Sequence, residues 1–187
     1  MGKTTHLTQL IRNHKLDILA LNELNLNDTI HTSTLNIPSS FNLLRFDRPN
    51  NSRGGCGMMI NKKLSYTELH VNHDVLNIEA TWIRLNKSNI NVCSFYRSHN
   101  YCSVENFIEY MHICMKKFNG KKVVWIGDVN IDQNNINSSQ YKKLDMTLKS
   151  YNLVQTVQGI TRMAKTGNKL TQSTIDVIEI VVERFSP

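Results

Sequence analysis

Three apolar stretches of strand length each end on polar side chains that suit catalysis or metal binding. The stretch DILALN leads into Glu23, INVCSF leads into Tyr96, and KVVWI leads through a glycine into Asp128 and Asn130. Strand ends can present side chains to a shared cleft while the backbone stays rigid, so these positions predict one site at the edge of a sheet. Any one of them has a plain alternative, because acidic residues also end strands where a turn begins.

The apolar stretches alternate with amphipathic segments. The segment 104–118 repeats apolar residues at helical spacing, as in Phe107, Met111 and Met115. Two stretches close in sequence, 75–85 and 90–96, alternate in polarity and predict a hairpin. Helices mixed with strands and a hairpin favour layered α/β packing with mixed sheets. We expect strands at 17–23, 41–46, 58–60, 75–85, 90–96, 122–126 and 174–182, and helices near the N-terminus, at 104–118 and at 141–151.

Composition limits the class of protein and of partner. The 187 residues suffice for one domain with a core of its own. The net charge of +7 and the pI near 9.3 favour a polyanionic partner, although a basic surface can also serve solubility alone. The four cysteines form no C-x-x-C pair, which favours reduced thiols in an intracellular compartment. No signal peptide and no apolar run near twenty residues is present, so we expect neither secretion nor membrane insertion.

Five motifs occur in an order that resembles a known family. They are D-I-L-A-L-N-E ending at Glu23, R-G-G-C-G beginning at Arg53, Y-R at Tyr96, G-D-V-N beginning at Gly127, and T-R followed by S-T-I-D ending at Asp176. Together they resemble the endonuclease/exonuclease/phosphatase family, and within it the apurinic-type endonuclease domain of non-LTR retrotransposons. The resemblance spans roughly residues 5–182.

The resemblance implies a fold. We expect a four-layer α/β/β/α sandwich of two mixed sheets flanked by helices, formed by one domain over residues 1–187. Relative to the family pattern this domain would be truncated at both ends and would lack the first and last strands. A missing strand leaves an open sheet edge, which predicts pairing with a protein partner or a second copy.

The resemblance also implies roles for the polar residues, with DNA as the substrate. Glu23 would hold Mg²⁺ (or Mn²⁺), Tyr96 would contact the scissile phosphate, and Asp128 would orient or deprotonate the attacking water. Asn130 would hydrogen-bond a phosphate oxygen, and Asp176 would lie on the cleft floor behind these groups. Residues expected to contact the nucleic acid are Arg97, Asn100 and Arg162. This mixture suits phosphodiester hydrolysis, which depends on positioning water and neutralising charge on the phosphate.

Two elements of the family pattern are missing from the sequence. The family carries an asparagine on a strand ahead of the first helix, and it ends on a Ser-Asp-His motif. Here no histidine follows His112. Loss of a general acid or base commonly costs about 10² to 10⁴ in rate, so impaired catalysis is expected. Two alternatives stay open: a non-catalytic module that binds nucleic acid or protein through the retained fold, and an enzyme for a small phosphoester. A product of a eukaryotic retrotransposon would be nuclear.

Overall fold

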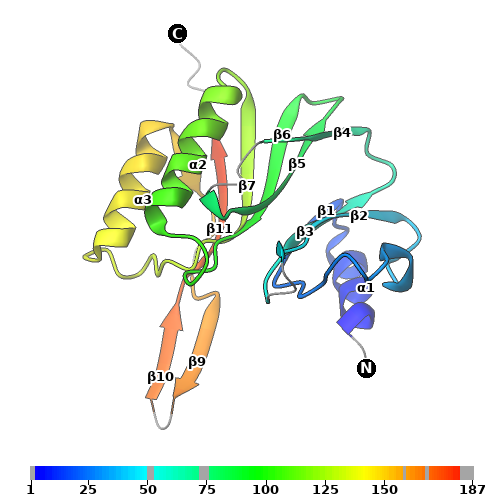
Figure 1. The fold of residues 1–187 in the computed structure, drawn as a ribbon, viewed down its shortest axis with the longest axis horizontal. Helices are drawn as coiled ribbons and strands as arrows, with labels where there is room; N and C mark the ends of the chain where they lie inside the picture. Colours follow the sequence, from blue (N-terminus) through cyan, green and yellow to red (C-terminus); the bar gives the residue numbers. More distant parts are fainter. Residues whose placement is uncertain (1–2, 50–52, 72–75, 158, 167–168, 182–187) are drawn as a thin grey trace.

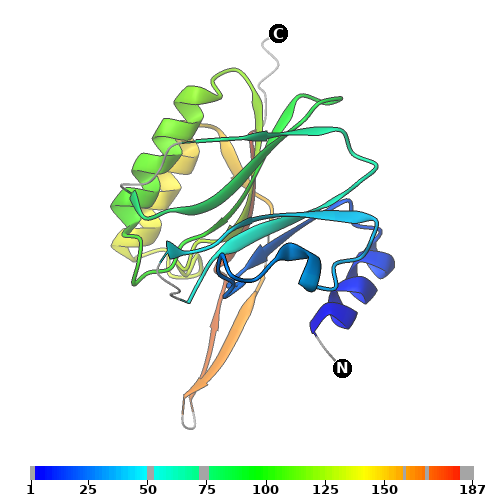
Figure 2. The same cartoon turned by 45° about the vertical axis from the view of Figure 1, so that its right-hand side comes forward.

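The computed structural model describes residues 3–49, 53–71, 76–157, 159–166 and 169–181. Two sheets lie face to face, and helices cover the outer face of each (Figures 1 and 2). The predicted α/β fold with sheets flanked by helices is confirmed. Within the described residues, no helix is long and apolar enough to cross a membrane.

The smaller sheet has three strands in the order β1-β3-β2, all antiparallel. Its helix α1 (Lys3–His14) packs Ile11 against Phe41 and Met59 on the outer face. Because β1 lies at one end of this order, it has an open edge among the described strands, and pairing of that edge with a partner stays a prediction. The elements are β1 (Ile18–Asn22), a short 3₁₀ helix η1 (Thr32–Thr34), β2 (Phe41–Phe46) and β3 (Cys56–Asn61).

The larger sheet has six strands in the order β4-β5-β6-β7-β11-β8. It is mixed, because β6 and β7 are parallel while the other described pairs are antiparallel. The helix α2 (Val104–Lys117) makes the crossover that a parallel pair requires, and α3 (Ser139–Ser150) lies beside it on the outer face (Figure 1). The strands are β4 (Tyr66–Leu69), β5 (Glu79–Leu85), β6 (Ile90–Tyr96), β7 (Lys122–Asp128), β8 (Leu153–Gln155) and β11 (Asp176–Val181).

Alternate side chains of the central strands enter two different core layers. Trp82, Phe95 and Trp125 pack against the helices, whereas Ile83 and Val92 pack against the smaller sheet. This alternation follows from the two-residue period of a strand and explains why both faces of the larger sheet are apolar. The buried indole of Trp82 donates through Nε1 to the hydroxyl of Tyr110 at 2.7 Å, so its polar atom is satisfied within the core.

A hairpin of β9 (Arg162–Thr166) and β10 (Lys169–Ser173) projects from the body of the molecule (Figure 1). The sequence did not predict this hairpin, nor the short strands β4 and β8. The other expected strands and helices are present with bounds shifted by a few residues. In particular, the strand expected at 75–85 begins at Glu79 and the one expected at 174–182 begins at Asp176, and residues 72–75 and 182 lie outside the described part of the chain.

Candidate active site

The carboxyl ends of β6 and β7 bring two predicted site residues together. The parallel register pairs Tyr96 with Asp128, and the antiparallel register of β11 pairs Asp176 with the same Asp128. The backbone N–H of Arg97 continues the ladder by donating to the carbonyl oxygen of Asp128 at 2.9 Å. Backbone pairing therefore sets Tyr96, Asp128 and Asp176 side by side.

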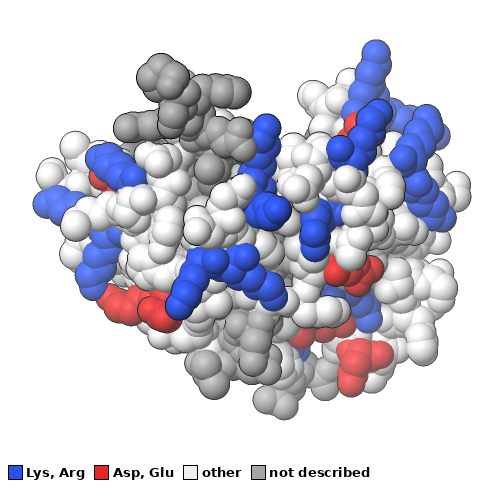
Figure 3. Space-filling view, turned by 90° about the horizontal axis from the view of Figure 1, so that it is seen from above, with Lys and Arg blue, Asp and Glu red and all other residues white. Residues whose placement is uncertain are grey.

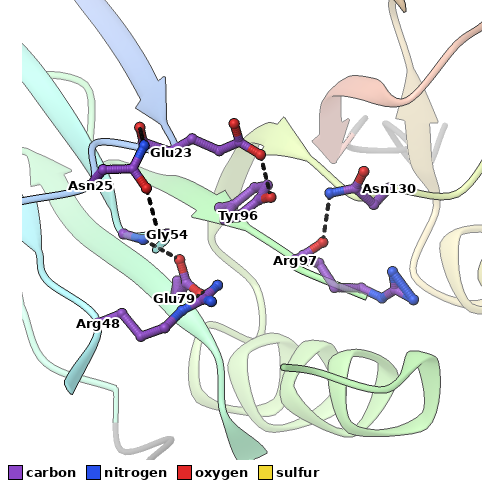
Figure 4. Close-up of polar contacts among 9 residues, drawn as sticks. Glu23, Asn25, Arg48, Gly54, Glu79, Tyr96, Arg97 and Asn130 are labelled. Carbon is purple, nitrogen blue, oxygen red and sulfur yellow. Dashed lines mark hydrogen bonds and ion pairs between the residues drawn. The ribbon is translucent and has the colours of Figure 1, made fainter. Parts of the chain in front are cut away.

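Glu23 reaches this group from the smaller sheet. It follows β1 directly, has a positive φ of 53° and is exposed. The hydroxyl of Tyr96 donates to Glu23 Oε1 at 2.6 Å, so the ends of the two sheets are joined by a hydrogen bond (Figure 4). The predicted convergence of Glu23 with the ends of β6 and β7 is thus present.

Burial and neighbouring carboxylates alter the acidity of the central groups. The pKa of Asp128 is raised to about 6, chiefly by burial and also by the charges of Asp176 and Glu23, against the lowering effect of the Asn130 N–H and of Arg162. Burial also raises the pKa of Tyr96 to about 12, helped by its hydrogen bond to Glu23. At neutral pH Asp128 is therefore mostly ionised and Tyr96 keeps its proton, so the pair can offer one acceptor and one donor.

Asn130 shapes the turn that follows β7. With a φ of 49°, its N–H donates to Asp128 Oδ1 at 2.7 Å and its side-chain Nδ2 donates to the carbonyl oxygen of Arg97 at 2.9 Å. Asparagine tolerates this left-handed conformation better than most residues. Asn130 therefore lies next to Asp128, as the sequence suggested, and a contact from it to a phosphate stays a prediction.

The three residues expected to contact nucleic acid have different surroundings. Arg97 is only 2% exposed, and its Nη1 donates to the carbonyl oxygen of Val129 at 3.1 Å, while its Nε finds no acceptor among the described residues. Arg162 and Asn100 are exposed. In this structure Arg97 supports the loop after β7 from within, and a nucleic-acid contact by any of the three stays a prediction.

Three residues of the site region were missed by sequence reasoning. The side-chain amide of Asn22 is oriented so that its nitrogen faces carbonyl groups. The nitrogen donates to the carbonyl oxygen of Phe95 at 2.9 Å, and the amide oxygen accepts from the N–H of Asp128 at 3.1 Å. Glu79 and Arg48 form a buried ion pair beside the glycine turn. The signal for Asn22 was its place one residue before Glu23. For the ion pair, the glutamate at a buried strand position was a weak signal and Arg48 gave none.

No group of three or more His, Cys, Asp or Glu side chains suited to a metal is found in the described part of the chain. Mg²⁺ usually needs fewer protein ligands, binding one or two carboxylates together with waters and substrate phosphates. Glu23, exposed and electrostatically coupled to Asp128, fits that lighter requirement.

A model of the endonuclease/exonuclease/phosphatase family matches residues 1–162. The chain belongs to this family.

Solved structures of endonuclease/exonuclease/phosphatase proteins share the fold at low sequence identity. The endonuclease domain of TRAS1, a telomere-specific non-LTR retrotransposon, matches with a TM-score of 0.71 and 18% identity, covering 94% of this chain and 78% of that one. The catalytic domain of Xenopus laevis APE2 matches with a TM-score of 0.64 and 14% identity over 94% of this chain and 77% of that one. D. rerio TDP2, complexed with a single-strand DNA product, matches with a TM-score of 0.63 and 11% identity, over 98% and 78%. Comparison with curated protein sequences gives no significant match.

Proposed function

We propose that this member of the endonuclease/exonuclease/phosphatase family is a divalent-metal-dependent phosphodiesterase that nicks DNA. The observation that carries the proposal is the meeting of Glu23, Tyr96 and Asp128, held by the Tyr96 hydroxyl and by the register of β6 and β7. This arrangement brings together an exposed carboxylate, a protonated hydroxyl and a half-buried carboxylate, which are groups that suit a phosphate and a metal ion.

In this proposal each group has one task. Asp128, ionised above pH about 6, accepts a proton from the attacking water or orients it. Tyr96, whose raised pKa keeps it protonated, redirects its single O–H from Glu23 to a phosphate oxygen when substrate is present. Asn130, next to Asp128, offers its amide to a second oxygen, and the charge of Asp176 adds to burial in raising the pKa of Asp128.

Glu23 would hold the Mg²⁺ (or Mn²⁺) ion. Family membership supports a divalent ion, and the exposed carboxylate beside the ionisable Asp128 suits one. When bound, the ion would supply neutralisation of negative charge on the phosphate.

Two further observations favour DNA as the substrate. The net charge of +7 suits a polyanion, and one structural relative is a retrotransposon endonuclease domain while another is complexed with single-strand DNA product. The charge alone does not locate the DNA, because Lys and Arg also spread over the end of the molecule where α2 finishes and β7 begins (Figure 3). We assign the DNA contact to the site, with two exposed candidates: Arg162, whose charge acts on Asp128, and Asn100, in the loop that follows Tyr96.

Nicking of supercoiled plasmid with Mg²⁺ tests the proposal. The wild-type chain should convert supercoiled to open-circular DNA, while Glu23→Ala and Asp128→Ala should lose this activity. Asp145→Ala is the matched control, because it removes a half-exposed carboxylate from α3 whose ion-pair partner among the described residues is Lys149. The impaired catalysis expected from the sequence stays a prediction, and the wild-type rate measures it.

The outcomes separate the competing functions. Nicking that both site variants retain would overturn the assignment. Salt-sensitive DNA binding by the wild type with no cleavage would favour a non-catalytic binding module instead. Hydrolysis of a small phosphoester in preference to plasmid would move the proposal to that substrate class.

A further inference from the structure

A buried carboxylate lies behind the candidate site with two kinds of partner. Glu79, at the start of β5, has a fully buried side chain. Its Oε1 accepts from Arg48, through Nε at 2.6 Å and also through Nη2, and its Oε2 accepts from the N–H of Gly55 at 2.6 Å. The ion pair is therefore hydrogen-bonded, through Glu79, to the backbone of the glycine turn at Gly55.

The other end of that turn is tied to the residues after Glu23. Asn25 donates its N–H to the carbonyl oxygen of Gly54 at 2.7 Å, and its side-chain Oδ1 accepts from the N–H of Gly54 at 2.9 Å (Figure 4). Leu24 donates its N–H to the carbonyl oxygen of Gly55 at 3.2 Å. Asn25 also donates through Nδ2 to the carbonyl oxygen of Glu23 at 2.8 Å. The backbone next to Glu23 is thus hydrogen-bonded to the same turn that accepts support from Glu79.

Both glycines are required by the closeness of this packing. A Cβ on Gly54 would lie 2.4 Å from the guanidinium carbon of Arg48, and a Cβ on Gly55 would lie 3.0 Å from the carbonyl oxygen of Phe46. Their φ values of 140° and 85° are also in the region that favours glycine. Arg48 therefore packs directly against the turn, in addition to its ion pair with Glu79.

A contribution to the stability of the fold does not by itself account for this buried ion pair. Burying two charges carries a desolvation cost that their attraction often fails to exceed, and well-packed apolar residues frequently do as well. The contacts instead form a continuous path from Arg48 and Glu79 through the glycine turn to Glu23. Arg48 also places its guanidinium 4.4 Å from the ring centre of Tyr101, in the loop that contains Asn100. One buried pair thus contacts both the glycine turn and the loop that precedes α2.

We infer that Arg48 and Glu79 are positioning residues that hold Glu23 in its metal-binding place through the Gly54–Gly55 turn. The inference rests on the proposed function for the metal, but the positioning can be measured without turnover. Partners that orient a metal ligand commonly affect metal affinity or activity by about 10- to 100-fold.

The test compares the wild type with the double variant Arg48→Met/Glu79→Leu, which removes both charges and leaves no buried charge without a partner. Two measurements are made on each metal-free protein: hydrogen exchange of the Leu24 and Asn25 amides, and Mn²⁺ binding followed by the paramagnetic resonance of the free ion. The variant should lose protection at both amides and bind Mn²⁺ about 10- to 100-fold more weakly. Glu23→Ala should abolish Mn²⁺ binding at this site.

Tyr110→Phe is the control for general loss of stability. It removes the buried hydrogen bond from Trp82, in the core on the other side of the larger sheet, and touches neither the turn nor Glu23. It should lower the unfolding temperature while leaving Mn²⁺ affinity and the two amides as in the wild type. A double variant with unchanged amide protection, or with lost protection but unchanged Mn²⁺ affinity, overturns the inference.

The failure of the proposed function would look different. A wild type that binds Mn²⁺ with the predicted dependence on Arg48 and Glu79 but does not nick DNA would contradict the nuclease proposal and support the positioning. A wild type whose Mn²⁺ binding is unaffected by Glu23→Ala would contradict both the metal role of Glu23 and the inference.

Discussion

The two sides of the candidate site are built in different ways. On the strand side, Tyr96, Asp128 and Asp176 are set by the hydrogen-bond register of β6, β7 and β11. On the loop side, Glu23 follows β1 with a positive φ and depends on side-chain and glycine contacts. Among the described residues, the strand side lies over the largest buried cluster, which includes Phe95 and Trp125, whereas the loop side belongs to the three-stranded sheet with its smaller core.

This difference shows which side-chain positions of the site are fixed by the sheet and which depend on a few polar contacts. A one-residue shift of register would move every side chain of a strand to the opposite face, so the strand side cannot slip by one residue without disrupting the core. The loop side can shift while the sheets remain intact, because it is fixed by a few polar contacts. Substitutions on the strand side should therefore affect chemistry or folding directly, and those on the loop side should first affect metal affinity.

The greatest loss of activity is expected from Asp128→Asn. The amide cannot accept a proton from water, and loss of a general base commonly costs about 10² to 10⁴ in rate. Stability should be unchanged or higher, because the raised pKa of Asp128 means that its ionised form is disfavoured by burial. Single-turnover nicking and thermal unfolding measure the two effects. A large fall in unfolding temperature would instead indicate a structural role.

The greatest loss of stability is expected from Gly127→Ala, on the same side. A Cβ at Gly127 would lie 1.9 Å from the carbonyl oxygen of Phe95, its register partner on β6. Forcing β6 and β7 apart should lower the free energy of unfolding by about 3 kcal/mol, as severe overpacking does. Gly120→Ala is the comparison: its Cβ meets open space and only its φ of 70° opposes it, so about 1 kcal/mol is expected. Equal effects in urea unfolding would contradict the tight contact between the strands.

On the strand side, a titration should show that the charge of Asp176 affects the pKa of Asp128. In the metal-free protein the carboxyl of Asp128 should titrate near pH 6, followed by carbon NMR. Because the folded pKa lies above the ordinary value, protonation favours the folded state, and the contribution of Asp128 to stability is lost as the pH rises through about 6. Asp176→Asn removes a neighbouring negative charge and should lower the pKa of Asp128. An unchanged or higher pKa would show that the two carboxyls do not interact.

The smallest effect is expected from Arg162→Ala, at the exposed rim beside the strand side. If Arg162 contacts a DNA phosphate, the variant should bind DNA more weakly and reduce the slope of log affinity against log salt by about one. The rate at saturating DNA should stay close to that of the wild type. Fluorescence anisotropy over a salt series measures this, and an unchanged slope would remove Arg162 from the DNA interface.

The contrast between the two sides also explains what the sequence could reveal. Two apolar runs that end on Tyr96 and Asp128 and are separated by one helix are typical of parallel strands whose carboxyl ends lie side by side. Glu23 was found by its motif. The ion pair that supports Glu23 was not found. Arg48 and Glu79 lie 31 residues apart in sequence, one after β2 of the smaller sheet and the other in β5 of the larger sheet, so no periodic pattern links them. The strands β9 and β10 were missed because their sequences, RMAKT and KLTQS, carry little of the alternation that a strand with one buried face shows.

The hydrogen bond between Tyr96 and Glu23 is where the two sides meet, so a double-mutant cycle on this pair tests most directly that they act as one site. Nicking rates would be measured for the wild type, Tyr96→Phe, Glu23→Gln and the double variant at fixed Mg²⁺. If the two groups act together, the double variant should be little slower than the slower single variant, because the first substitution already removes their shared contribution. Rates that fall by the product of the two single effects would contradict a joint site.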